Sequence, residues 1–303
     1  MAVTALFSRC ARSGASPIRA LSQRNFSSVK EVVPLAYHLY EPTDSTAPKN
    51  DAPIVVMHGL FGSKQNNRTI SKALARDLNR PVYAVDLRNH GDSPHHKRHD
   101  YIAMAEDVEH FLVDKKLGPE TTLLGHSMGA KTAMAVSLRS PSLVRDLVVV
   151  DNAPVSSTLH SSFGTYIRAM RQIEESKLTK QSEADKILSE YEPNLGIRQF
   201  LLTNLTREEG SPYLKFRVPI KILGSALDEI GDFPFTPEKD RFEGRALFVR
   251  GTKSHYVPDE HIPIIGRFFP LFRLKDIDAG HWVISEKPIE FKEAVVEFLQ
   301  NSE

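Results

Sequence analysis

The stretch Thr121-Thr122-Leu123-Leu124-Gly125-His126-Ser127-Met128-Gly129-Ala130 decides the fold of this chain. Residues 121–124 are typical of a buried strand, and a helical pattern begins at Ala130, directly after a turn with two glycines. A serine between glycines in this context matches the G-x-S-x-G pattern of a nucleophile elbow. The alternative is a plain turn serine, but the flanking strand and helix favour Ser127 as a nucleophile.

Short apolar runs alternate with amphipathic helical patterns on both sides of this turn. The runs expected to be strands buried on both faces are 53–57, 81–87, 121–124, 147–150, 246–249 and 272–277. Helical patterns cover 70–78, 102–113, 130–138 and 291–299. This order predicts an α/β fold with a doubly wound, mostly parallel sheet.

Residues 155–240 interrupt the alternation. They are richer in charge, show helical patterns at 166–178, 182–191 and 197–205, and contain no convincing buried strand. Because strand-like sequence resumes at Ala246, we expect a helical cap inserted into one domain over residues 33–301. Four cap residues either select the substrate or simply pack the cap helices: Phe163, Tyr166, Met170 and Phe200.

A second glycine motif follows the strand expected at 53–57. It reads His58-Gly59-Leu60-Phe61-Gly62, where a loop can supply half of an oxyanion hole. The backbone N–H groups of Leu60 and Met128 would then converge on a developing oxyanion.

The general base must be one of twelve histidines. His281, in Asp278-Ala279-Gly280-His281-Trp282, follows the last expected strand and precedes the last helix, so we predict that it is the base. His95, His96 and His99 resemble a metal site, but Lys97 and Arg98 would repel a cation, and no metal is expected.

These motifs resemble those of the α/β-hydrolase superfamily. The segments 125–131, 86–93 (Asp-Leu-Arg-Asn-His-Gly-Asp-Ser) and 151–154 (Asp-Asn-Ala-Pro) are similar to a mitochondrial subgroup that includes the yeast ethanol acetyltransferases and related esterases. The resemblance covers residues 33–301 and implies an α/β-hydrolase fold. It also implies formation of acetate esters from acetyl-CoA and an alcohol, or hydrolysis of esters and thioesters.

The triad acid is less obvious. The loop after 246–249, its usual place in the superfamily, offers no carboxylate before Asp259. Asp151 ends the strand expected at 147–150, and the resemblance implies an acid there, with Ser254 as an auxiliary partner of His281. We favour Asp151 over Asp228, although Asp151 could instead pin the turn at 152–154.

The predicted activity is that of a serine acyl hydrolase or acyltransferase with a Ser127, Asp151 and His281 triad. An acyl-enzyme would pass its acyl group to water or to an alcohol. No cofactor is expected, with acetyl-CoA a candidate substrate, and the partners are small esters, thioesters or alcohols. The alternative is a catalytically weak hydrolase-like protein that binds a mitochondrial partner.

Residues 1–30 differ from the rest of the chain because they are basic, contain six serines and have no acidic residue. This composition is typical of a mitochondrial transit peptide, here expected over 1–26 with a matrix destination, and otherwise of a basic tail. Loss of 1–26 would change the formal charge from +1 to −3, which gives no sign of a nucleic-acid partner. Cys10 alone cannot form an internal disulfide, and no apolar run is long enough to span a membrane.

Overall fold

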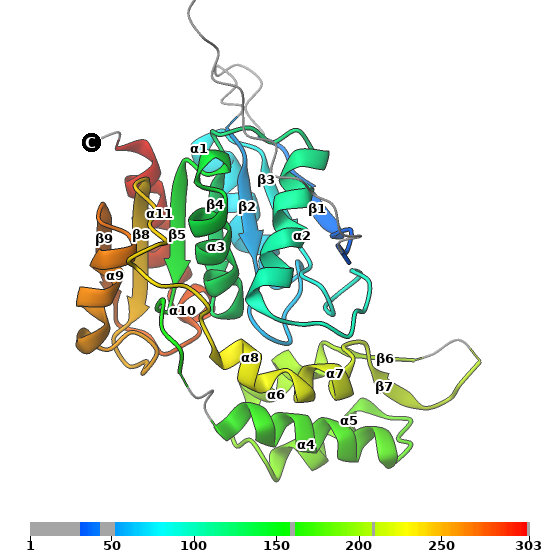
Figure 1. The fold of residues 1–303 in the computed structure, drawn as a ribbon. Helices are drawn as coiled ribbons and strands as arrows, with labels where there is room; N and C mark the ends of the chain where they lie inside the picture. Colours follow the sequence, from blue (N-terminus) through cyan, green and yellow to red (C-terminus); the bar gives the residue numbers. More distant parts are fainter. Residues whose placement is uncertain (1–30, 43–51, 158–160, 208–209, 302–303) are drawn as a thin grey trace, which may run out of the picture. The chain divides into compact units, whose positions relative to one another are not determined.

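A seven-stranded sheet organises the fold (Figure 1). Its order is β1-β3-β2-β4-β5-β8-β9, and every neighbouring pair is parallel except β1 with β3. The strands are β1 (Tyr37–Tyr40), β2 (Ile54–Met57), β3 (Val82–Val85), β4 (Thr122–His126), β5 (Asp146–Val150), β8 (Arg245–Gly251) and β9 (Phe272–Ile277). The predicted mostly parallel α/β sheet is therefore confirmed.

The computed structural model describes residues 31–42, 52–157, 161–207 and 210–301. Residues 32–303 form one structural unit. The expected transit peptide lies outside the described residues. No helix in the described ranges is long and apolar enough to cross a membrane.

The two edges of the sheet differ from the prediction. β1 was not anticipated, because only Tyr40 of its four residues is buried and so brief a run has no clear pattern. β9 was expected to be buried on both faces, which is wrong. It is an edge strand in which Ile277 alone is buried, since nothing pairs with its outer side within the sheet.

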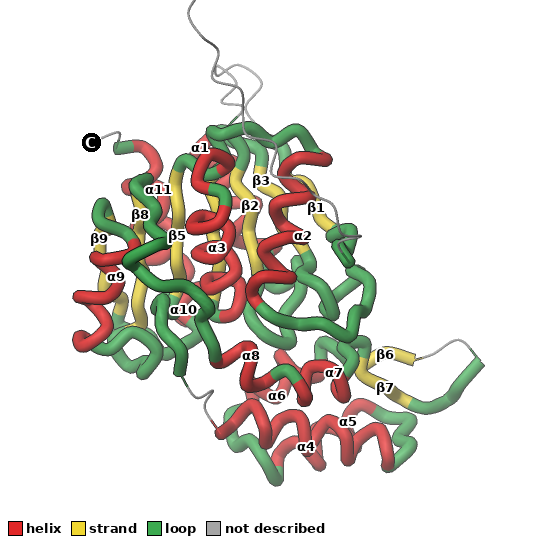
Figure 2. The backbone as a smooth tube through the Cα atoms, in the orientation of Figure 1, coloured by secondary structure: helices red, strands yellow, loops and turns green. Residues whose placement is uncertain are grey.

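Helices cover both faces of the sheet (Figure 2). On one face α1 (Arg68–Leu78) and α11 (Pro288–Gln300) pack in one hydrophobic cluster. On the other face lie α2 (Tyr101–Asp114), α3 (Met128–Arg139) and α9 (Ile262–Phe268). The short α10 (Val283–Glu286) precedes α11, and two 3-10 turns occur at Pro141–Leu143 and Asp259–His261.

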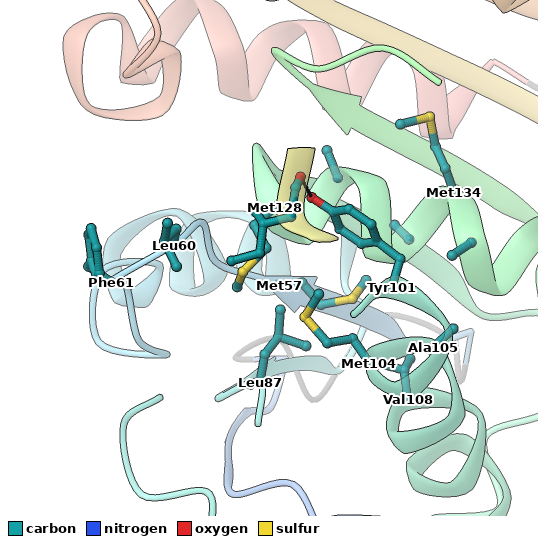
Figure 3. Packing of buried hydrophobic residues seen from close by; sticks show 14 of the residues in the cluster. Met57, Leu60, Phe61, Leu87, Tyr101, Met104, Ala105, Val108, Met128 and Met134 are labelled. Carbon is teal, nitrogen blue, oxygen red and sulfur yellow. Dashed lines mark hydrogen bonds between the residues drawn. The ribbon is translucent and has the colours of Figure 1, made fainter. Parts of the chain in front are cut away.

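Strand β2 shows how one sheet serves two cores. Ile54 and Val56 belong to the cluster with α1 and α11, whereas Val55 and Met57 belong to the other cluster. All four side chains are fully buried, because alternate residues of a strand point to opposite faces and both faces are covered. Figure 3 shows Met57 with Met104 and Tyr101 of α2.

The insertion between β5 and β8 lies beyond the carboxyl ends of the strands and is called the cap below (Figure 1). It contains α4 (Ser161–Glu175), α5 (Gln181–Ser189), α6 (Leu195–Leu202), α7 (Ile220–Ser225) and α8 (Leu227–Gly231). An antiparallel pair, β6 (Leu205–Arg207) with β7 (Leu214–Phe216), also lies in the cap. Its strands are three residues each, too short for a hydrophobic period to predict them.

Candidate active site

Ser127 lies in the sharp turn between β4 and α3, with φ 54° and ψ −115°. A side chain held in such a region costs about 1–3 kcal/mol, so the surrounding contacts must fix it. A Cβ added to Gly125 would lie 2.1 Å from the carbonyl oxygen of Gly129, and one on Gly129 would lie 2.6 Å from that of His58. Close backbone contact therefore requires both glycines.

Ser127, His281 and Asp151 lie in one hydrogen-bonded series. The Ser127 hydroxyl donates to Nε2 of His281 at 3.0 Å, and Nδ1–H of His281 donates to Oδ2 of Asp151 at 2.6 Å. The Asp151 side chain is fully buried, and that of His281 is 16% exposed. Because the carboxylate accepts from Nδ1, the imidazole is held in the tautomer whose Nε2 can accept a proton.

Asp151 is held by further donors at the carboxyl end of β5. Its Oδ1 accepts from the backbone N–H of Gly251 at 3.0 Å, and its Oδ2 accepts from the Ser254 hydroxyl at 2.5 Å. Asp228, the other candidate, is exposed in the first turn of α8. The structure thus brings Asp151 to His281, and Ser254 contacts the acid rather than the histidine.

A small cavity of about 10 Å³ lies against Ser127. Leu60 and Met128 both border it, as do Phe163 and Tyr256. Figure 3 shows Leu60 on the loop after β2, near Met128 at the start of α3. This volume is about the least that holds one water molecule, so the space has room for roughly one oxygen or one methyl group.

The loop that carries Leu60 is fixed at Phe61, whose φ is 62°. The N–H of Phe61 donates to Nε2 of His90 at 3.1 Å. Its carbonyl oxygen accepts from Nδ2 of Asn204 at 2.8 Å. Asn204 is buried and follows α6 in the cap, so a residue 143 positions away supports this loop. No local sequence signal marks such a pair.

The buried histidines near Ser127 and His281 make structural hydrogen bonds. Nδ1–H of His58 donates to the carbonyl of Gly59, and its Nε2 accepts from the N–H of Leu87. Burial lowers the pKa of His58, and burial lowers that of His90 well below the usual value. Burial, followed by the charge of His281, lowers the pKa of His126 to about 4. Nε2–H of His126 donates to the carbonyl of His281.

The three histidines that resembled a metal site do not form one shared site. His95 is exposed, His96 is half-buried and His99 is buried beside Asn89. Within the described ranges, no group of three histidine, cysteine or acidic side chains is arranged to hold a metal ion.

The four cap residues separate into two pairs. Phe163 borders the small cavity, and Phe200 packs against Trp282 with ring centroids 4.6 Å apart. Tyr166 and Met170 are buried in the hydrophobic cluster of the cap and the sheet. The first pair lies at the site, and the second pair packs the cap.

Two residues at the site were missed by sequence reasoning. The ring of Tyr256 stacks on His281, with centroids 4.0 Å apart and planes at 21°. Burial lowers the pKa of Lys131 to about 8, and its ammonium donates to the carbonyl of Gly231 at 2.9 Å. Lys131 lies in α3, four residues after Ser127 and thus on the same helix face, which was the available signal.

Comparisons with known proteins agree with this fold. The alpha/beta hydrolase fold family matches residues 52–288. A probable alcohol acetyltransferase of Saccharomyces cerevisiae is 44% identical and covers 83% of this chain and 78% of its own. The sn-1-specific diacylglycerol lipase ABHD11 of Mus musculus is 42% identical, and the match covers 88% of this chain and 85% of the lipase. A marine microorganism esterase of known structure is 31% identical, with a TM-score of 0.80, and the match covers 88% of this chain and 99% of the esterase.

The family match covers most of the chain, the relatives are similar over most of their own length, and the fold is that of the esterase. The chain therefore belongs to the α/β-hydrolase fold family of enzymes.

Proposed function

We propose that this protein is a serine-dependent acyl hydrolase or acyltransferase in which Ser127, Asp151 and His281 are the catalytic triad. The observation that carries the proposal is the series of hydrogen bonds from a buried carboxylate, through one imidazole, to a hydroxyl on a strained turn. This arrangement activates a serine by an adjacent base that a third group orients.

The reaction starts when His281 accepts the proton of Ser127 and Oγ bonds to the acyl carbon. The backbone N–H groups of Leu60 and Met128 stabilise the oxyanion, and each such donor is worth about 2.7–4 kcal/mol of barrier. As the bond to the leaving oxygen or sulfur breaks, His281 returns the proton to it. Water or an alcohol then gives its proton to His281 and bonds to the acyl carbon, the bond from that carbon to Oγ of Ser127 breaks, and His281 returns the proton to Oγ, which releases an acid or a new ester.

The acyl group is proposed to be short, with acetyl as the reference case. The space beside Ser127 has room for roughly one methyl-sized group, and Phe163 and Tyr256 border it. The yeast relative named as a probable alcohol acetyltransferase supports an acetyl group as the acyl group and an alcohol as its acceptor, and the relative of Wickerhamomyces anomalus named as an ethanol acetyltransferase supports ethanol as that alcohol. We take acetyl-CoA as the donor to be tested. The small cavity favours such groups over the long acyl chains of a diacylglycerol.

A fluorophosphonate probe tests the activated serine. We expect the probe to label the wild-type protein and to leave the Ser127→Ala variant unlabelled at equal concentration. Retained labelling of the variant would assign the nucleophile elsewhere, and an unlabelled wild-type protein with a normal fold would contradict the enzymatic proposal.

Product analysis with acetyl-CoA, with and without ethanol, separates transfer from hydrolysis. Ethyl acetate in the presence of ethanol indicates acyl transfer, whereas acetate and free CoA alone indicate hydrolysis. The Ser127→Ala variant is the control, because both products must disappear if they arise from one acyl-enzyme.

We also propose that the protein is imported into the mitochondrial matrix by its basic, serine-rich residues 1–26. A fluorescent fusion of residues 1–30 tests this, since a cytosolic signal contradicts it. Replacing Arg9, Arg12, Arg19 and Arg24 with Gln in the same fusion should abolish import.

A further inference from the structure

A groove of about 890 Å³ lies between α1, α6 and the segment formed by α10 and the start of α11. Its volume falls in the range of about 300–1,000 Å³ that ligand pockets occupy. Apolar side chains supply much of its lining, among them Ile70, Ala73, Ile197, Phe200 and Ile289. The groove is therefore suited to an apolar chain.

The groove lies beside the proposed triad. Its wall includes Gly59, His126 and Trp282, and each of these is adjacent in sequence to a residue of the proposed machinery. A Cβ on Gly59 would lie only 3.3 Å from Cβ of Ser127. Gly59 thus lies between the wall of the groove and Ser127, which itself borders the small cavity, while the exposed side chain of Ile289 lines the groove at the surface.

Asn67 is one of the polar residues in the lining, which also include the charged Glu286 and Lys292. The residue is 5% exposed, and its Nδ2 has no hydrogen-bond partner among the described residues. Asn67 precedes α1 without capping it through its side chain. A buried donor without a protein partner is satisfied by water or by an oxygen of a ligand. The groove is therefore suited to a molecule that has both an apolar chain and an oxygen atom.

We propose that the groove binds the leaving group of the substrate, and that this group carries an unbranched apolar chain. The inference rests on the proposed function. The cavity beside Ser127 is too small for a long acyl chain, so an ester with one long chain fits with that chain on its alcohol side. The same groove receives a chain-bearing alcohol when such an alcohol attacks the acyl-enzyme.

The reaction balances with no further reactant than water or this alcohol. Oγ of Ser127 bonds to the acyl carbon while the bond from that carbon to the alcohol oxygen breaks. His281 gives the proton taken from Ser127 to the departing alkoxide, and the free alcohol leaves along the groove. A thioester reacts in the same way, with its thiol as the leaving group.

Two isomeric esters test the direction of the chain in the wild-type protein. Octyl acetate and ethyl octanoate have the same atoms, and only the side that carries the long chain differs. We expect kcat/KM to be about tenfold higher or more for octyl acetate, because even one methylene in an apolar pocket is worth about tenfold. Equal turnover, or a preference for ethyl octanoate, overturns the inference.

A matched pair of variants tests the location. Ala73→Trp fills the groove from α1. Lys72→Trp adds the same side chain at the preceding position of that helix, which is exposed and does not line the groove. We expect Ala73→Trp to lower the ratio of kcat/KM for octyl acetate to kcat/KM for ethyl acetate about tenfold. Lys72→Trp should leave this ratio as in wild type. An unchanged ratio in Ala73→Trp contradicts a chain-specific site.

The isomer test in wild type does not depend on the folding of any variant. Hydrolysis of ethyl acetate that needs Ser127, without preference between the isomers, overturns the groove assignment and leaves the proposed function intact. If the wild-type protein hydrolyses no ester and takes no fluorophosphonate, the proposed function fails, and this inference fails with it.

Discussion

The side-chain amide of Asn204, in the cap, donates a 2.8 Å hydrogen bond to the carbonyl of Phe61, in the loop next to Ser127. The peptide N–H of the same Phe61 donates to His90 of the sheet domain. Phe61 has a positive φ, and hydrogen bonds to its N–H and its carbonyl hold it in this conformation. The cap therefore fixes the backbone that carries Leu60.

Asn204→Ala should lower kcat for a short ester about tenfold with KM nearly unchanged, because a looser loop misplaces the Leu60 donor mainly in the transition state. Steady-state kinetics measure this. Thr203→Ala, at the neighbouring exposed position, is the control. If Asn204→Ala lowers the melting temperature but not kcat, Asn204 has a structural role only.

Asp151→Asn should lower kcat by about 10⁴-fold, since an amide cannot orient the imidazole with the tautomer that accepts the serine proton. Asp228→Asn should be close to wild type, because Asp228 is exposed on α8. Ester hydrolysis by both variants, with circular dichroism to check the fold, decides between the two acids. Near-normal turnover in Asp151→Asn would transfer the role to another carboxylate.

Tyr256→Phe should keep at least half of the wild-type kcat, because the aromatic ring that stacks on His281 remains. Tyr256→Leu should lower kcat about tenfold, because the imidazole loses a flat surface that limits its rotation. Equal losses in both variants would assign the effect to the phenolic hydroxyl instead.

The residues that local sequence could identify are those whose role is set by adjacent residues. Gly125-His126-Ser127-Met128-Gly129 predicts its own turn, because its glycine-serine-glycine pattern is local, and Gly125 is required by a backbone contact with Gly129 within the turn. Gly129 is required by a second contact, with the backbone of His58. His281 and Asp151 could be inferred from their places at strand ends, since parallel strands bring their carboxyl ends to one edge.

Residues whose role depends on distant packing could not be found this way. Asn204 and Phe61 are 143 positions apart, and nothing in the sequence near either one indicates the other. The cap hairpin β6 and β7 and the edge strand β1 are short, so no apolar period marks them. The edge position of β9 depends on the order of strands, which its own apolar residues do not specify.

Acid should destabilise the fold through its buried histidines. Burial lowers the pKa of His126 to about 4 and that of His99 to about 3. A histidine in the unfolded chain has a pKa of about 6.5, so below that pH the unfolded chain binds protons that the folded chain does not. The free energy of unfolding should therefore fall as pH decreases from about 6.5, by about 1.4 kcal/mol per pH unit for each such histidine.

His99→Gln tests this linkage, because a glutamine oxygen can still accept from Asn89 but does not titrate. We expect the slope of unfolding free energy against pH, measured by urea denaturation between pH 6 and pH 4.5, to decrease by about 1.4 kcal/mol per pH unit. His110→Gln makes the same change on the exposed side of α2 and should leave the slope unaltered. A slope that His99→Gln does not alter would mean that His99 is protonated in the folded protein, against the burial that the structure gives it, whatever the variant's overall stability.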